Sequence, residues 1–466
     1  MAETQGSSLD PDNIDAVFKA YDVRGTVPDQ IDEPLARATG RAFVQVVGAA
    51  DGGRIVIGHD MRPSSPTLAR AYAEGATEAG ADVVMIGLAS TDQLYFASGH
   101  LGIPGVMFTA SHNPAQYNGI KQCRAHAAPV GMESGLREIR DLVLAGSPAP
   151  EGVAPGGVTE QDVLTAYAEH LLSLAPVRGR RLKVVVDAGN GMAGHTAPAV
   201  FDLVGTEQVE LIPLYFELDG TFPNHEANPI EPANLVDLQA EVRRAGADVG
   251  LAFDGDADRC FLVDERGELV SPSTLTALIA ARELAKAPGS AVIHNLITSR
   301  AVPEIVSELG GTPVRTRVGH SFIKARMAET DAVFGGEHSG HFYFRDFWRA
   351  DSGMLAALHT LAALAESDLS LSELLAPYER YPLSGEINST VPDQRAVVHA
   401  IEGEYGGRDG VTLDHLDGLT VSHPEWTFNV RASNTEPLLR LNAEGTDAAT
   451  MERVRDEVLA LIRKDC

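Results

Sequence analysis

Cysteine is scarce in this chain of 466 residues, and basic residues are much rarer than acidic ones. The three cysteines, Cys123, Cys260 and Cys466, have an odd count and no CxxC spacing, which excludes a disulfide scaffold and fits a reducing cytoplasm. Glycine (45) and proline (26) are too few for a low-complexity or collagen-like chain. No apolar run approaches the ~18–20 residues of a membrane span, and the polar, acidic N-terminus lacks the pattern of a secretory signal. We therefore expect a cytoplasmic globular protein of several domains.

The formal net charge of −28 bears on the possible partners. Such an acidic chain repels nucleic acid phosphates and anionic membranes, so we expect neither as a partner. A local basic pocket can still bind a small phosphorylated ligand, and the charge does not exclude that class of molecule.

Short apolar, β-branched runs alternate with helical stretches along most of the chain, which predicts parallel βαβ units. The runs fall into three triplets and precede a stretch that reads as a smaller α+β domain with a helix over 448–464. The expected strands are 54–60, 81–87 and 104–109; 182–187, 209–215 and 248–253; 291–295, 312–317 and 331–334. We expect four domains, at 1–155, 156–270, 271–380 and 381–466, with a Pro/Gly-rich linker after the first.

A polar, small-residue loop follows the third strand of each triplet. The loops are Ala110–Pro114, Asp254–Arg259 and Gly335–His341. Open parallel sheets bind ligands beyond the carboxyl ends of their strands. The sequence therefore predicts that the three loops line one interdomain cleft.

The second loop carries three alternating carboxylates, Asp254, Asp256 and Asp258. In extended backbone this spacing points the three side chains the same way, and hard oxygens gathered at one point suit Mg²⁺. An EF-hand is the tempting alternative, because Glu265 stands at its twelfth position, but Arg259 occupies the place of the required glycine. The guanidinium of Arg259, beside these carboxylates, is suited to bind a phosphate through two hydrogen bonds.

Two further strings offer groups for phosphate chemistry. Ser111 stands at the end of a strand beside His112, although no activating base can be identified from the loop alone. The stretch Arg431–Pro437 combines a guanidinium, hydroxyls, an amide and turn N–H groups, which together make a phosphate cradle.

Two alternatives compete with this interpretation. Gly189–Gly194 is a literal G-x-G-x-x-G after a predicted strand, with Glu217 further on, and would indicate a dinucleotide-binding oxidoreductase. That hypothesis leaves the Asp cluster and the serine loop without a role. His338 and His341 have a spacing that zinc ligands use, but no third ligand is evident nearby.

Taken in order, the loops form the signature of the α-D-phosphohexomutase family, which the chain resembles from end to end. Within the family it looks most like the bacterial phosphomannomutase/phosphoglucomutase branch. The matching strings are Tyr21–Gly25, Gly58–Ser65, Thr109–Pro114, Asn118–Lys121, Asp254–Arg259, Gly319–Lys324, Gly336–His341 and Arg431–Thr435.

The resemblance implies three related α/β domains with mixed sheets and a smaller C-terminal α+β domain around a central cleft. It implies a phosphorylated Ser111, with Mg²⁺ held by the three aspartates and a phosphoryl oxygen. The other implied roles are transfer of the phosphoryl group (Arg24, Lys121 and Arg259), contact with the sugar hydroxyls (Glu337 and Ser339), a place beside the sugar (His320 and His341) and contact with the second phosphate (Arg431, Ser433, Asn434 and Thr435).

The implied activity is the interconversion of hexose 1-phosphate and hexose 6-phosphate, of mannose or glucose, through a hexose 1,6-bisphosphate that also serves as activator. His338 stands where many relatives carry methionine, which leaves the sugar preference open. A non-catalytic sugar-phosphate-binding protein is the remaining alternative, and it would bind hexose phosphates without isomerising them.

Overall fold

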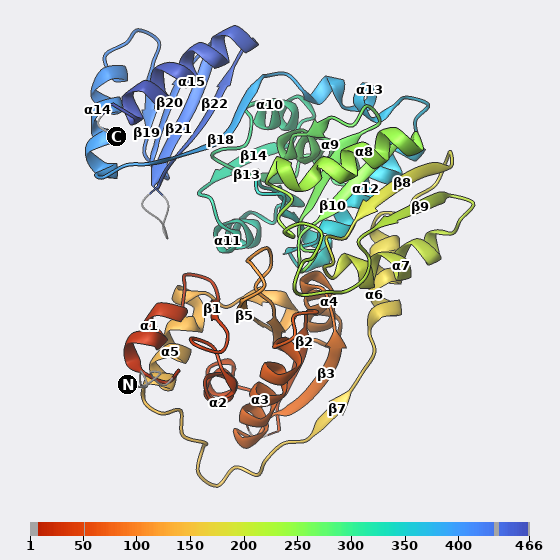
Figure 1. Ribbon diagram of the computed structural model, residues 1–466, viewed down its shortest axis with the longest axis vertical. Coiled ribbons are helices and arrows are strands. Elements are labelled where there is room, and N and C mark those ends of the chain that lie inside the picture. Colours follow the sequence, from red (N-terminus) through yellow and green to blue (C-terminus); the bar gives the residue numbers. More distant parts are fainter. Residues whose placement is uncertain (1–7, 51, 433–437, 465–466) are drawn as a thin grey trace. The chain divides into compact units, whose positions relative to one another are not determined.

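The computed structural model describes residues 8–50, 52–432 and 438–464. The chain divides into two compact units. The first comprises residues 1–270 together with 339–372, and the second comprises 271–338 together with 373–466. Figure 1 labels many of the elements of both units. No helix among the described residues is long and apolar enough to cross a membrane.

A seven-stranded mixed sheet forms the N-terminal part of the first unit, with strand order β1-β5-β4-β2-β3-β7 and β6 paired to β5. Strands β2, β3, β4 and β7 run parallel, and β1, β5 and β6 pair antiparallel. Buried side chains of α2 and α3 pack with the strands in one core. The strands are β1 (Val23–Thr26), β2 (Arg54–His59), β3 (Asp82–Leu88), β4 (Gly105–Phe108), β5 (Tyr117–Arg124), β6 (Ala128–Pro129) and β7 (Val158–Glu160); the helices are α1 (Pro11–Val17), α2 (Glu33–Val47), α3 (Ser65–Glu78), α4 (Thr91–Leu101) and α5 (Arg137–Leu144).

The second sheet of this unit has the order β12-β11-β10-β8-β9. Strands β8, β9 and β10 are parallel, and β11 and β12 return antiparallel. Every residue of β10 is buried, as expected for a continuous apolar run at the centre of a sheet. The elements are β8 (Leu182–Asp187), β9 (Val209–Leu214), β10 (Val249–Phe253), β11 (Cys260–Asp264), β12 (Leu269–Val270), α6 (Leu164–Leu174), α7 (Ala193–Val204) and α8 (Val236–Ala245).

The third expected α/β region is divided between the units. In the second unit β13 pairs parallel with β14 and β15, whereas in the first unit β16 pairs antiparallel with β17. The elements are β13 (Ala291–Asn295), β14 (Thr312–Thr316), β15 (Phe334–Gly336), β16 (Phe342–Phe344), β17 (Ala350–Asp351), α9 (Pro272–Lys286), α10 (Ala301–Glu308), α11 (His320–Thr330), α12 (Gly353–Ala365) and α13 (Leu371–Leu375).

An antiparallel sheet of order β18-β22-β21-β20-β19 forms the C-terminal part of the second unit. Apolar residues of α14 and α15 pack against one face of it, while the alternate residues of the strands, such as Asn429, Arg431 and Asn442, are polar. The elements are β18 (Leu383–Thr390), β19 (Thr412–Asp414), β20 (Leu419–His423), β21 (Trp426–Ala432), β22 (Leu438–Gly445), α14 (Gln394–Tyr405) and α15 (Ala448–Ile462).

The expected mixed-sheet α/β architecture with a smaller α+β domain is confirmed. The last of the nine expected strands lies later than predicted, because Asp331 caps α11 in the left-handed region (φ 48°) and turns the chain before Phe334. The strands at 182–187 and 291–295 have the predicted bounds.

Candidate active site

Ser111 lies in the loop that leaves β4, with only 3% of its surface exposed. Its backbone adopts φ 51°, a strained conformation for a residue with a side chain. The Ser111 amide donates to Thr109 Oγ1 at 2.9 Å. The loop therefore holds the Ser111 side chain in one place at some conformational cost.

The side chain that secures this loop is Arg62, which the sequence analysis did not single out by itself. Its guanidinium is fully buried and lies 3.2 Å from the Asp60 carboxylate. Nη2 donates to the carbonyls of Ser111 (3.0 Å) and Asn113 (2.7 Å). Nη1 donates to the carbonyls of Pro114 (2.9 Å) and of Tyr117 at the start of β5 (3.0 Å). In the sequence, its importance is indicated by its place in Gly58–Ser65, one of the strings that resemble the family.

The carboxylates of Asp254, Asp256 and Asp258 follow β10 and are all buried. The expectation of an extended backbone between them is wrong: the loop is a turn in which the Ala257 amide donates to the Asp254 carbonyl (3.0 Å) and Ala257 has φ 60°. The turn nevertheless brings one oxygen of each carboxylate within 4.8 Å of the others. Convergence comes from the turn and not from strand alternation.

The EF-hand alternative is excluded by the segment after this loop. Cys260–Asp264 is strand β11, and Glu265 accepts hydrogen bonds from the amide and hydroxyl of Ser372, at 3.0 and 2.5 Å. Glu265 therefore points its carboxylate at another element and not into the Asp loop.

The serine loop and the aspartate loop meet, although 143 residues separate Ser111 from Asp254. Ser111 Oγ donates to Asp254 Oδ2 at 2.7 Å. A Cβ on Gly255 would lie 2.4 Å from the Ser111 carbonyl oxygen, so only glycine allows the two loops to approach this closely. Two of the three expected cleft loops are thus adjacent in the first unit.

Two cations compensate the three carboxylates. Arg259 donates from Nε to Asp254 Oδ2 (3.0 Å) and from Nη2 to Ser111 Oγ (3.1 Å). Lys121 Nζ on β5 lies 2.7 Å from one oxygen of Asp256 and 2.7 Å from one oxygen of Asp258. The five side chains bring together three potential negative charges and two positive ones.

Burial and mutual attraction divide the protons unequally among these groups. Burial raises the pKa of Asp254 to about 7, the neighbouring carboxylates add to the rise, and Arg259 opposes it. Burial also acts to raise the pKa of Asp256, but attraction to the Lys121 ammonium outweighs burial and holds this pKa below its ordinary value. Burial alone would lower the pKa of Lys121, yet its two carboxylate partners raise it, so this side chain stays charged.

The donor set fits a hard divalent cation. Oδ1 of Asp256 and Oδ1 of Asp258 are buried and have no hydrogen-bond partner among the described residues, while Oδ2 of each is bound by Lys121. Unpartnered buried carboxylate oxygens are costly unless a cation binds them. Oxygen ligands with net negative charge are what Mg²⁺ prefers.

His112 and Arg24 flank the serine. His112 Nδ1 lies 3.4 Å from Ser111 Oγ and is contacted by the Arg259 guanidinium. Burial, and then Arg259, hold the pKa of His112 well below its ordinary value, so its ring is neutral at pH 7. Arg24 on β1 donates to Asn113 Oδ1 at 2.7 Å and pairs with Asp22. Both predicted residues therefore lie beside the serine loop.

His341 also reaches this cluster in the first unit. Its Nδ1 lies 2.9 Å from Asp351 Oδ2 and 3.7 Å from Asp258 Oδ1. These two carboxylates outweigh the effect of burial and raise the pKa of His341. Asp258, His341 and Asp351 form a second group that could hold a metal ion; His338 belongs to neither such group among the described residues. Asp351 was not predicted, because no local pattern marks it.

The remaining predicted residues lie mostly in the second unit. Glu337 follows β15 and is buried, and His320 begins α11. Arg431 lies on β21 with Nη2 at 3.1 Å from Glu386 Oε2. Ser339 is the first residue of the 339–372 segment of the first unit. The predicted residues Ser433, Asn434 and Thr435 lie outside the described residues.

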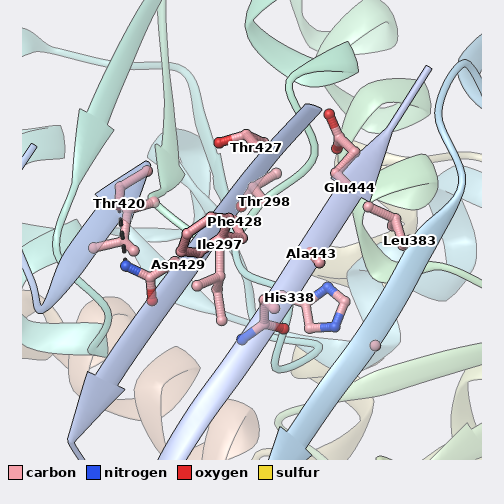
Figure 2. Close-up of a pocket in the computed structure, with 13 residues that line it drawn as sticks. Ile297, Thr298, His338, Leu383, Thr420, Thr427, Phe428, Asn429, Ala443 and Glu444 are labelled. Carbon is pink, nitrogen blue, oxygen red and sulfur yellow. Dashed lines mark hydrogen bonds between the residues drawn. The ribbon is translucent and has the colours of Figure 1, made fainter. Parts of the chain in front are cut away.

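His338 lines a cavity of about 40 Å³ in the second unit. Figure 2 shows its ring near Ala443, with the amide of Asn429 hydrogen-bonded to Thr420 (3.0 Å) on the other side of the cavity. Burial, and then the nearby Arg431 charge, lower the pKa of His338, with Glu386 opposing this. The ring is therefore neutral at pH 7.

The glycine-rich string after β8 has a structural use. A Cβ on Gly191 would lie 2.7 Å from the Gly255 carbonyl oxygen, and one on Gly194 would lie 2.3 Å from the Phe216 carbonyl oxygen. The Met192 amide donates to that same Gly255 carbonyl at 2.9 Å. Gly191 thus allows its backbone to pack against the aspartate loop, and Gly194 allows its backbone to pack against that of Phe216.

The site contains a serine hydroxyl that is bound to a carboxylate and a guanidinium and lies beside further carboxylates and a lysine. Such a site suits phosphoryl transfer, because that reaction depends on positioning and charge compensation. Comparison with known proteins identifies the family. Four sequence models described as phosphoglucomutase/phosphomannomutase match the chain: alpha/beta/alpha domain I (15–148), domain II (165–267), domain III (271–381) and the C-terminal domain (386–461).

Relatives agree with this assignment. The chain is 42% identical over 451 residues to phosphohexose mutases of Xanthomonas campestris pv. campestris, covering 96% of this chain and 99% of that protein. It is 40% identical over 455 residues to a phosphomannomutase of Escherichia coli, with coverage of 96% and 99%. A phosphoglucomutase/phosphomannomutase family protein of Burkholderia thailandensis has a similar crystal structure, with a TM-score of 0.87, 32% identity and coverage of 97% and 98%.

The chain belongs to the phosphoglucomutase/phosphomannomutase family, so it is an enzyme that acts as a hexose phosphate mutase. The family predicted from the motifs is thereby confirmed.

Proposed function

We propose that the enzyme interconverts hexose 1-phosphate and hexose 6-phosphate through a phosphorylated Ser111 and a hexose 1,6-bisphosphate intermediate. The observation that carries the proposal is the environment of Ser111 Oγ, which is bound to Asp254 at 2.7 Å and to Arg259 at 3.1 Å. A hydroxyl without chemical function has no need of a strained backbone or of two charged partners.

In the first half of the reaction, the free hydroxyl of the hexose phosphate attacks the phosphorus on Ser111. The bond from phosphorus to Ser111 Oγ breaks, a bond to the sugar oxygen forms, and the hydroxyl proton passes to the enzyme. The bisphosphate then turns around, and its other phosphoryl group returns to Ser111. Arg259, Lys121 and Arg24 neutralise the charge on the transferred group and hold it in line.

We infer that Asp254, Asp256 and Asp258, with an oxygen of the Ser111 phosphoryl group, hold Mg²⁺. When bound, this ion would withdraw charge from the phosphoryl oxygens. The buried Oδ1 atoms of Asp256 and Asp258, which accept no hydrogen bond from the described residues, support the assignment. A hexose 1,6-bisphosphate is the expected activator, because it phosphorylates any enzyme molecule that has lost its phosphoryl group.

The second phosphate of the substrate is assigned to the Arg431 loop, and the sugar to Glu337, Ser339, His320 and His341. The guanidinium of Arg431 is held by Glu386, which supports a fixed direction for its remaining N–H groups. A separate phosphate cradle allows the bisphosphate to turn around, since either phosphate can occupy it.

Intact-mass measurement of the purified protein tests the proposal. We expect an additional ~80 Da after incubation with glucose 1,6-bisphosphate, absent in Ser111→Ala. Ser134→Ala is the matched control, since Ser134 lies in the same domain outside the site, and it should keep the added mass. Absence of the added mass in the native protein would refute the phosphoserine route.

A further inference from the structure

The first turn of α4 contacts the aspartate loop through Thr91, a fully buried residue without a predicted role. Thr91 Oγ1 donates to Asp256 Oδ2 at 2.5 Å, and the Thr91 amide donates to the Asp256 backbone carbonyl at 3.0 Å. The two residues are 165 positions apart in the sequence. Thr91 thus binds both the side chain and the main chain of one carboxylate residue.

These contacts determine which oxygen of Asp256 remains available. Oδ2 receives Thr91 Oγ1 and Lys121 Nζ, at 2.5 and 2.7 Å. Oδ1 is buried, and no group in the described part of the chain donates a hydrogen bond to it. Because a carboxylate is planar and rigid, fixing Oδ2 by two donors also fixes the direction of Oδ1.

Thr91 is itself held by its neighbour Asp92. The fully buried Asp92 Oδ2 accepts from Tyr167 Oη on α6 (2.7 Å) and from Ser352 Oγ at the start of α12 (2.6 Å). Its Oδ1 accepts from the Ser90 hydroxyl. The start of α4 is therefore tied to two other helices and cannot shift without breaking buried hydrogen bonds.

We propose that Thr91 is a positioning residue for the metal site: it binds Asp256 Oδ2 and so presents Oδ1 to the divalent cation. The inference deepens the proposed function and rests on the assignment of the metal to this cluster. Groups that orient metal ligands from outside commonly change metal affinity about 10- to 100-fold when removed.

The experiment measures Mg²⁺ affinity directly, by calorimetric titration of the metal-free full-length protein with MgCl₂. Thr91→Val keeps the branched shape but lacks the hydroxyl, and Thr91→Ser keeps the hydroxyl. We expect Mg²⁺ binding to weaken about 10-fold in Thr91→Val and to stay within about twofold of the native value in Thr91→Ser. Thr91→Ala replaces Thr91→Val if the valine does not fold.

A second readout separates positioning from general destabilisation. In Thr91→Val, we expect kcat to fall at limiting Mg²⁺ and to recover most of its native value at saturating Mg²⁺, because the defect is one of affinity. A loss of kcat that saturating Mg²⁺ does not relieve would overturn the inference.

Asp256→Asn distinguishes this inference from the proposed function. If Asp256→Asn abolishes Mg²⁺ binding but Thr91→Val binds like the native protein, only the role of Thr91 is refuted. If neither the native protein nor any variant binds Mg²⁺, the metal assignment fails, and the role of Thr91 fails with it.

Discussion

The guanidinium of Arg62 holds the serine loop through four backbone carbonyls, and replacing it by lysine tests whether this support positions Ser111. A lysine keeps the positive charge beside Asp60. Its single ammonium nitrogen cannot bind all four carbonyls, which the guanidinium binds through two separate nitrogens. At least two of the four hydrogen bonds should be lost in Arg62→Lys.

The magnitude follows from the burial of this site. Hydrogen bonds from a charged donor contribute about 1.5–3 kcal/mol each, so losing two costs at least about 3 kcal/mol. For a domain of this size, a loss of about 3 kcal/mol lowers Tm by roughly 6–12 °C. Because a displacement of about 1 Å at a reacting group can cost about 100-fold in rate, we expect kcat to fall by about that factor.

The assay combines differential scanning calorimetry with the rate of hexose 1-phosphate isomerisation. Arg37→Lys is the matched control: Arg37 is a half-exposed arginine in the same domain, paired with Glu78, so the same substitution should cost less than about 1 kcal/mol. The reasoning is refuted if Arg62→Lys has Tm and kcat values indistinguishable from those of Arg37→Lys.

Three further predictions concern the proposed chemistry. EDTA, which removes the metal, and Asp256→Asn, which removes a hard ligand, should each lower turnover by orders of magnitude; near-normal activity in EDTA would contradict the metal role. Asp256→Asn should also lower the free energy of unfolding, because it removes the buried charge that pairs with Lys121. Arg431→Ala should cost about 2–4 kcal/mol of transition-state binding, or about 30- to 1000-fold in kcat/KM, and an unchanged kcat/KM would place the second phosphate elsewhere. The family resemblance implies that Glu337 and Ser339 contact the hydroxyls on carbons 3 and 4, which leaves carbon 2 without an identified partner, so mannose and glucose 1-phosphates should both react. Glucosamine 1-phosphate should be a poor substrate, because like charges of its ammonium and of Arg259 and Lys121 would repel. A mannose-to-glucose ratio of kcat/KM beyond about 10³ would mean that carbon 2 is recognised, and His338 would be the first residue to substitute.

Strand-and-loop order was predictable from the sequence, because each signal is local. Short β-branched runs such as those within 182–187 and 291–295 favour strands, and both ranges are strands with the predicted bounds. The polar residues at the ends of such runs mark the edge where ligands bind in open sheets. Ser111 and the aspartate cluster stand at such ends, so the sequence alone marks them as candidate site residues.

The conformation of the aspartate loop was not predictable by the same means. Alternating carboxylates are compatible with extended backbone and with a turn, and the left-handed Ala257 that makes the turn carries no sequence signal. The turn is packed between neighbours distant in sequence: Gly255 lies against the Ser111 carbonyl, and the Thr91 amide donates to the Asp256 carbonyl.

By itself the sequence determined the order of the elements, the family and the residues that carry chemical groups, because these depend on local patterns and on motif strings. The tertiary structure alone decided which other side chains hold these chemical groups in position. Thr91 reaches Asp256 across 165 positions, and Arg62 reaches the serine loop across about fifty. A threonine at a helix start or an arginine after a strand looks ordinary in sequence, because the property that makes it important is a partner brought close only by folding.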